Sequence, residues 1–129
     1  MSMADSEVRA TIAVSDIDSA KAFYEGKLGL TAQEGGPDAV RVYECGNGSL
    51  LQVYASPDHA GKATATVASF SAPEFETQVD ELLEAGVEFA NYDAPGGDER
   101  GIHTFGSHKV VWFEDPDGNV IAVDNGSDY

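Results

Sequence analysis

The stretch that decides the fold of this chain is "WFEDPDGNVIAVD", residues 112–124. Apolar residues on both sides of the turn "DPDG" predict two strands that form a hairpin. An earlier stretch repeats this pattern, because "VRVYECGNGSLLQV" (residues 40–53) aligns without a gap on residues 110–123 and superposes Gln52 on Ala122. The chain is therefore predicted to contain two copies of one module.

A strand and a helix precede the hairpin of the first module. Apolar residues alternate from Val8 to Val14, which predicts a half-buried strand with one apolar face. Helical periodicity follows directly, and Gly29 ends it. Ser15 or Asp16 is the predicted N-cap of this helix, with capping-box spacing between Ser15 and Asp18.

The second module follows the same plan. The stretch "TATVASFSA" (residues 64–72) predicts a strand, and an apolar stripe from Phe75 to Leu83 predicts a helix that ends at Gly86. A further strand is predicted around residues 87–92, before the loop that leads to the C-terminal hairpin. The expected fold class is α+β, with tandem β-α-β-β modules at about residues 8–55 and 64–124 in one domain that spans residues 1–129.

Several motifs in this order resemble the vicinal-oxygen-chelate superfamily. They are "SDID", "AFYEGKLGL", "ELLEAGVEF" and the terminal "WFEDPDGNVIAV". The resemblance runs from Val8 to Asp124, and the superfamily includes glyoxalase I, extradiol dioxygenases, fosfomycin-resistance enzymes and bleomycin-resistance proteins. It implies curved mixed sheets around a concave cavity, and chains that pair as homodimers.

The composition excludes some partners and leaves one question open. Seven basic residues against 23 acidic ones give a net charge of −16, which argues against nucleic acid because phosphates would be repelled. The acidic charge either forms a solvated surface, suited to solubility or to a salty cytoplasm, or attracts a cationic ligand. The start of the chain lacks the pattern of a secretory signal, there is one cysteine, and no stretch is apolar enough to span a membrane. We therefore expect a cytoplasmic protein.

The resemblance also implies four metal-ligand positions, which in this chain are Arg9, Gln52, Val67 and Ala122. Only Gln52 carries an oxygen donor, and the guanidinium of Arg9 would oppose the charge of a metal. We therefore expect no metal and no other cofactor. The alternative is one divalent metal recruited through Gln52, His103 and Glu114, in a lyase, an isomerase or a dioxygenase.

Strand alternation predicts which residues line the cavity. We predict ligand-binding roles for Arg9, Thr11, Gln52, Tyr54, Ser69, His103, Trp112 and Glu114. Two alternatives stay open: Trp112 fills the barrel or a dimer seam, and His103 is an ordinary edge-strand residue. No catalytic residue is identified.

Three functions remain open after these steps. The leading hypothesis is a metal-independent protein that binds a small cationic or aromatic molecule, resembling the bleomycin-resistance branch. The second is the metal-dependent enzyme of the same superfamily. The third is a structural or regulatory module without a cavity.

Overall fold

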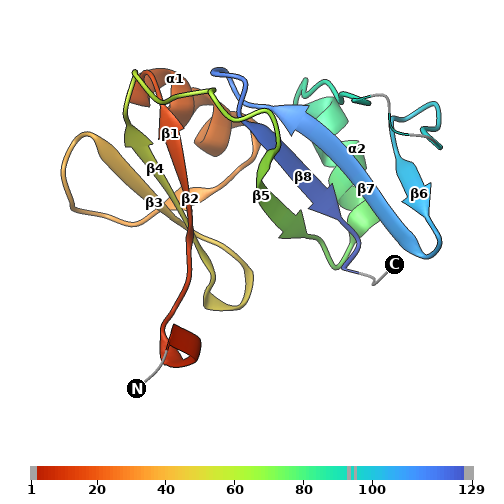
Figure 1. The fold of residues 1–129 in the computed structure, drawn as a ribbon, viewed down its shortest axis with the longest axis horizontal. Coiled ribbons are helices and arrows are strands. Elements are labelled where there is room, and N and C mark those ends of the chain that lie inside the picture. Colours follow the sequence, from red (N-terminus) through yellow and green to blue (C-terminus); the bar gives the residue numbers. More distant parts are fainter. Residues whose placement is uncertain (1–2, 93, 95, 127–129) are drawn as a thin grey trace. The chain divides into compact units, whose positions relative to one another are not determined.

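The computed structural model of the chain describes residues 3–92, 94 and 96–126. The chain divides between Ala60 and Gly61 into two compact units. Each unit holds a four-stranded mixed sheet with helical structure on one face, as Figure 1 shows. In the described part of the chain, no helix has the length and apolar character needed to cross a membrane.

The first unit forms one sheet in the order β1-β4-β3-β2. Strands β1 and β4 are parallel, and the other neighbours are antiparallel. The elements are η1 (Met3–Asp5), β1 (Ala10–Val14), α1 (Ile17–Lys21), η2 (Ala22–Lys27), β2 (Thr31–Ala32), β3 (Val40–Glu44), η3 (Gly46–Gly48) and β4 (Leu50–Ala55).

The helix of the first unit begins at Asp16 and changes its hydrogen-bond pattern within one turn. Asp16 is the N-cap, because its carboxylate accepts hydrogen bonds from the backbone N–H and the hydroxyl of Ser19, both at 2.9 Å. The predicted box between Ser15 and Asp18 is therefore wrong. From Ala22 the helix continues as the π-helix η2, which ends with the N–H of Leu28 bonded to the carbonyl of Phe23.

The core of the first unit lies between this helix and one face of the sheet. Tyr24 stacks on Tyr43 with ring centroids 6.0 Å apart, and both rings are fully buried. The Tyr43 hydroxyl donates to Glu25 at 3.0 Å, and Arg41 forms an ion pair with the same carboxylate at 3.1 Å. Burial, followed by the hydrogen bond to Glu25, raises the pKa of Tyr43 to about 12.

The second unit forms a sheet in the order β5-β8-β7-β6, with β5 parallel to β8. In Figure 1, α2 lies behind β7 and β8. The phenyl ring of Phe113 and the side chain of Val111 face that side and are buried, as predicted. The elements are β5 (Thr66–Ser71), α2 (Phe75–Glu84), β6 (His103–Phe105), β7 (His108–Glu114) and β8 (Val120–Asp124).

Tight turns hold the ends of these elements. After α2, Gly86 adopts a φ of +87°, and the N–H of Val87 bonds to the carbonyl of Leu82, which confirms the predicted C-cap. In the "DPDG" turn, the buried carboxylate of Asp115 accepts hydrogen bonds from the backbone N–H and the side-chain amide of Asn119. These bonds fix the hairpin between β7 and β8.

The predicted repeat is confirmed by the pairing of strands. Val42 pairs with Gln52 in the first sheet, and Trp112 pairs with Ala122 at the equivalent place in the second. The two modules therefore share one hairpin register.

Two predicted strand segments are wrong. β1 begins only at Ala10, so Val8 lies outside the sheet and is 88% exposed. Residues 87–92 form a loop that makes a single bridge, between Ala90 and Trp112. The loop leaves the sheet after this bridge, where Tyr92 adopts a positive φ that an extended strand does not allow.

Candidate functional site

Among the described residues of the second unit, no helix covers one face of its sheet, and four of the predicted residues lie there. Ser69 and Trp112 flank Ala122, so these three side chains form one row across β5, β8 and β7. Glu114 lies two residues further along β7, and His103 begins the neighbouring strand β6. We call this surface the helix-free face of the second unit.

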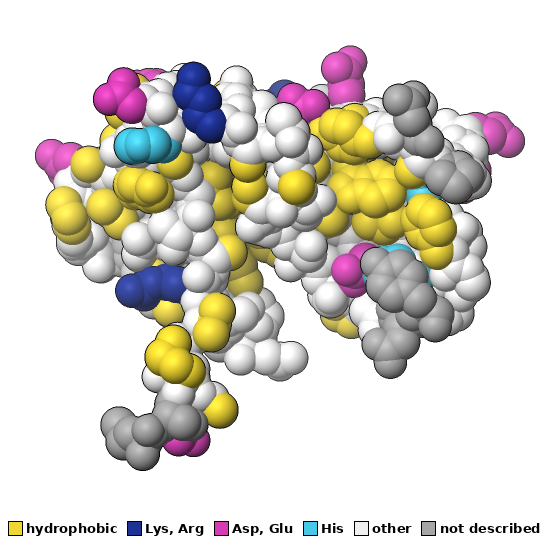
Figure 2. Space-filling model, viewed as in Figure 1, with side chains coloured by type: hydrophobic (Ala, Val, Ile, Leu, Met, Phe, Trp, Pro, Cys, Tyr) yellow, Lys and Arg dark blue, Asp and Glu magenta, His cyan; other side chains and the backbone are white. Residues whose placement is uncertain are grey.

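Trp112 is the centre of a group of aromatic rings on this face. Its ring centroid lies 5.1 Å from that of His103, and 6.3 Å from that of Tyr92, whose plane is nearly perpendicular to the indole at 80°. Hydrophobic side chains gather over β7 in the space-filling view (Figure 2). Trp112 itself is half-buried, so part of the indole is accessible. We call Tyr92, His103 and Trp112 the aromatic cluster.

Tyr92 is held over Trp112 by its hydroxyl group. The hydroxyl donates to Oε2 of Glu114 at 2.9 Å. Burial, followed by this hydrogen bond, raises the pKa of Tyr92 to about 12. The backbone of Tyr92 has a φ of +47°, a conformation that costs a residue with a Cβ roughly 1–2 kcal/mol. The contacts with Trp112 and Glu114 offset that cost and fix the phenol nearly perpendicular to the indole.

His103 forms the floor of the aromatic cluster and is 1% exposed. The backbone of Gly97 bridges to His103 and packs directly on its ring. A Cβ added at Gly97 would lie 2.9 Å from Cε1 of His103, which is closer than real Cβ atoms approach. Glycine at this position is therefore required for the present position of the imidazole.

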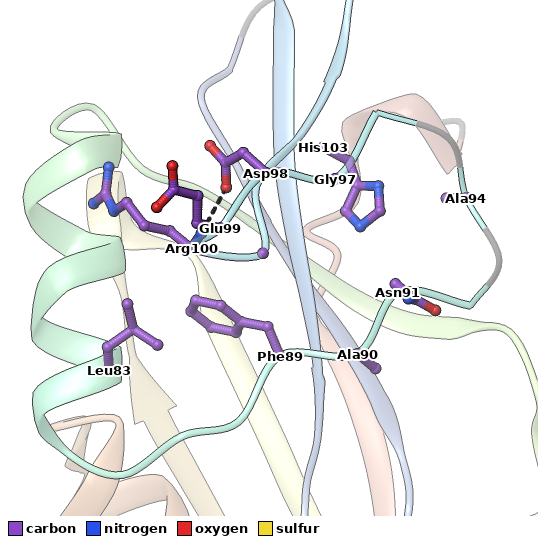
Figure 3. Close-up of a pocket in the computed structure, with 11 residues that line it drawn as sticks. Leu83, Phe89, Ala90, Asn91, Ala94, Gly97, Asp98, Glu99, Arg100 and His103 are labelled. Atoms are coloured by element: carbon purple, nitrogen blue, oxygen red, sulfur yellow. Dashed lines mark hydrogen bonds between the residues drawn. The ribbon is translucent and has the colours of Figure 1, made fainter.

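A pocket of about 450 Å³ adjoins the aromatic cluster, and we call it the loop pocket. Figure 3 shows Leu83 of α2 and Phe89 on one side of it, and His103 and Asn91 on the other. The wall is formed by residues 89–91, 94, 97–101 and 103 together with Leu83. Because His103 lines the pocket and also contacts Trp112, a molecule bound at either place would affect the same imidazole.

The loop around this pocket is tied to α2 through Arg100. Its guanidinium donates to Oε1 of Glu76 and to Oδ1 of Asp80, both at 2.6 Å. The hydrogen bond to Glu76, the largest cause, raises the pKa of Arg100. Asp98 stabilises the same turn, because its carboxylate accepts the backbone N–H groups of Arg100 and Ile102 at 2.9 Å.

The remaining predicted residues belong to the first unit. Thr11 and Val42 flank Gln52 in one row of the first sheet, equivalent to the row that contains Trp112 in the second. Tyr54 lies two residues along β4 and is half-buried. Arg9 precedes β1 and is exposed. The structure thus brings Thr11 and Gln52 together and leaves Arg9 outside the sheet.

Comparison with known proteins identifies the family. The family model for the Glyoxalase/Bleomycin resistance protein/Dioxygenase superfamily matches residues 8–123. The chain belongs to this superfamily. A comparison with curated proteins gave no match.

Solved structures show the same superfamily fold. A glyoxalase/bleomycin resistance protein from Catenulispora acidiphila DSM 44928 is 27% identical, with a TM-score of 0.68 over 92% of this chain and 96% of that one. TnmS3, an antibiotic binding protein from Streptomyces sp. CB03234, is 24% identical, with a TM-score of 0.65 over 95% and 98%. The fosfomycin resistance protein FosX from Mesorhizobium loti is 11% identical, with a TM-score of 0.64 over 95% and 93%.

The four metal-ligand positions implied by the superfamily do not carry a set of donors that fits a divalent metal. Arg9 is a cation, and Val67 and Ala122 have no donor atom. Val67 also lies at a bulge between Thr66 and Ala68, outside the register of β5 with β8. Within residues 3–92, 94 and 96–126, no group of three or more His, Cys, Asp or Glu side chains could hold a metal ion.

Tyr92 was not predicted as a member of the site. Residues 87–92 were expected to form a strand, and strand alternation gave no reason to place the phenol over Trp112. The available signal was an aromatic residue at the start of a loop rich in glycine and proline, where binding residues are often found.

Proposed function

We propose that this superfamily member is a metal-independent protein that binds a small molecule at the aromatic cluster of its second unit. The observation that carries the proposal is the half-buried Trp112 with Tyr92 fixed perpendicular to it and His103 packed beside it. Aromatic side chains with a few placed polar groups are typical of small-molecule sites. The loop pocket beside the cluster offers further contact surface.

The chemistry of the four superfamily metal positions supports the metal-independent form of the proposal. A cation, two aliphatic side chains and one amide give no reason for a Lewis-acid centre there. TnmS3, with the same fold, is an antibiotic binding protein, so the fold is compatible with binding of this kind. Pairing of two copies of the chain is part of the proposal, and light scattering after size-exclusion chromatography tests it.

Ligand screening combined with Trp112 emission tests the binding proposal. Trp112 is the only tryptophan, so a change in its emission reports its own surroundings. Metabolites and antibiotics that raise the melting temperature should change this emission on titration. Calorimetry measures the affinity of Trp112→Ala, which has no tryptophan, and this variant should bind the same ligands about two- to tenfold more weakly, or roughly 0.5–1.5 kcal/mol for one aromatic pair.

Two controls keep this test decisive. Trp112→Phe keeps a ring and loses the indole N–H, and the melting temperature of each variant shows that it is folded. Unchanged affinity in a folded Trp112→Ala protein would contradict a site at the aromatic cluster. Stoichiometric zinc, nickel, manganese or iron in protein purified without chelator, measured by mass spectrometry, would favour the metal-dependent enzyme instead.

A further inference from the structure

The helix-free face of the second unit carries two carboxylates near Trp112. Glu114 lies two residues from Trp112 along β7, and Asp124 lies two residues from Ala122, the partner of Trp112, along β8. Residues two apart on a strand point to the same face with α-carbons about 7 Å apart. Both carboxylates are therefore within reach of a ligand that covers the indole.

Within the described part of the chain, the hydrogen bonds that these carboxylates accept come from neutral groups. Glu114 accepts from the Tyr92 hydroxyl, and Asp124 accepts from the Ser71 hydroxyl at 2.9 Å. Among the residues that the structure describes, no lysine or arginine forms an ion pair with either carboxylate. No ion pair among the described residues therefore neutralises the negative charge of these two carboxylates.

The basic residues of the second unit that form ion pairs do so with α2. Arg100 pairs with Glu76 and Asp80, and Nζ of Lys109 lies 3.6 Å from Glu76. Lys109 alternates with Val110 along β7, so it belongs to the side of the sheet that α2 covers. The positive charges of Arg100 and Lys109 thus lie beside α2, while the helix-free face keeps its two carboxylates.

From this arrangement we propose that the ligand of the aromatic cluster is an aromatic organic cation, with an amidinium group or an alkyl-linked ammonium group on an aromatic ring. This inference rests on the proposed function and adds the chemical class of the ligand. The ring of the ligand stacks on the accessible part of Trp112. The cationic group lies near the faces of Trp112 or Tyr92, where a cation–π attraction acts, and beside Glu114. Tyr92 holds Glu114 in place through the hydrogen bond from its hydroxyl.

Three probes with the same phenyl ring and two-carbon linker test the charge preference. They are phenethylamine (cation), 3-phenylpropanamide (neutral) and 3-phenylpropanoate (anion), each titrated at pH 7 while the emission of Trp112 is recorded. Phenethylamine should bind about tenfold more tightly than the amide, the ratio expected from one cation–π contact with one nearby carboxylate. The propanoate should bind more weakly than the amide.

Two carboxylate variants locate the effect. Glu114→Gln keeps an acceptor for the Tyr92 hydroxyl and removes the charge, so it should reduce the affinity for phenethylamine several-fold and leave the amide unchanged. Glu84→Gln removes the same charge at the end of α2, on the other side of the sheet. It should change neither the affinity for phenethylamine nor the affinity for the amide. Raising KCl from 0.1 to 0.5 M should weaken only the binding of phenethylamine, because salt screens the attraction.

The outcomes separate this inference from the proposed function. Equal or tighter binding of the amide or the propanoate, seen through Trp112, would overturn the cation preference and leave a binding site at the aromatic cluster. An equal loss of phenethylamine binding in both carboxylate variants would also overturn it. If no probe changes the emission of Trp112, both the preference and the proposed site are wrong.

Discussion

A single hydrogen atom of Gly97 separates the loop backbone from the His103 ring. In Gly97→Ala, the new methyl group would lie 2.9 Å from Cε1 of His103, so the imidazole must shift from its present position beside Trp112. We expect a loss of about 1–3 kcal/mol in the free energy of unfolding, as for other overpacked sites. A shift of the Trp112 emission maximum in the folded protein should accompany that loss.

The matched control for this change is Gly46→Ala. Gly46 has no atom within 4 Å of an added Cβ, and its φ is not in the left-handed region. Urea unfolding and emission spectra of the two variants give the comparison. A Gly97→Ala protein with wild-type stability and emission would show that the backbone relaxes without disturbing His103.

Tyr43 makes the stability of the first unit depend on alkaline pH. Its pKa is raised to about 12 from an ordinary value of 10, so the folded state holds this proton more tightly than the unfolded state. The resulting stability is fully present below about pH 10 and is lost as the pH rises toward 12. Tyr43→Phe should remove this part of the pH dependence, and at pH 8 it should cost about 0.5–1.5 kcal/mol for the lost hydrogen bond to Glu25.

Urea unfolding of both proteins at pH 8 and pH 11 measures the difference. The gap in stability between wild type and Tyr43→Phe should narrow at pH 11. A gap of equal size at both values would mean that the Tyr43 proton is not linked to folding.

At the scale of elements, Arg100 joins the pocket loop to α2. Its two ion pairs reach Glu76 and Asp80, which lie one helical turn apart. Arg100→Gln removes both ion pairs. It should lower the melting temperature and weaken the binding of any ligand that contacts the loop pocket. Because Arg100 and its partners are partly exposed, salt screens these ion pairs. The fall in melting temperature should therefore be larger at 0.1 M salt than at 1 M.

Lys109→Gln is the control for this prediction. It removes the same charge from the same unit, but the ion pair of Lys109 with Glu76 is longer, at 3.6 Å, and does not anchor the loop. Thermal unfolding of both variants at the two salt concentrations distinguishes the loss of the ion pairs between Arg100 and α2 from the loss of one positive charge. Equal losses in both variants would contradict a specific role for Arg100.

Elements with a strong hydrophobic period were predictable from the sequence, and elements fixed by single contacts were not. Alternation along β7 placed Trp112 and Phe113 on opposite faces, because a strand has only two faces. The π-helix η2 was not predicted, because the spacing of apolar residues does not distinguish backbone hydrogen bonds between residues four apart, as in an α-helix, from those between residues five apart. Tyr92 was misplaced because its positive φ depends on tertiary contacts with Trp112 and Glu114.

At the scale of the whole molecule, the net charge of −16 predicts a response to salt. Like charges repel one another within the folded chain, and this repulsion weakens as the Debye length falls from ~10 Å at 0.1 M salt to ~3 Å at 1 M. The melting temperature should therefore rise over this range of KCl. Sucrose at equal osmolality serves as the uncharged control. A melting temperature that stays flat or falls in KCl would show that the charges are already balanced locally.

The duplicated hairpin gives this chain two copies of the same position, filled by Val42 in one module and Trp112 in the other. A mutation at one copy leaves the other intact, so the two can diverge one substitution at a time. Val42→Trp, together with Gln52→Ala, would give the first module the Trp–Ala pair of the second, beside Thr11 in place of Ser69. The second copy of the hairpin thus offers a backbone on which another recognition surface could evolve or be engineered by substitution alone.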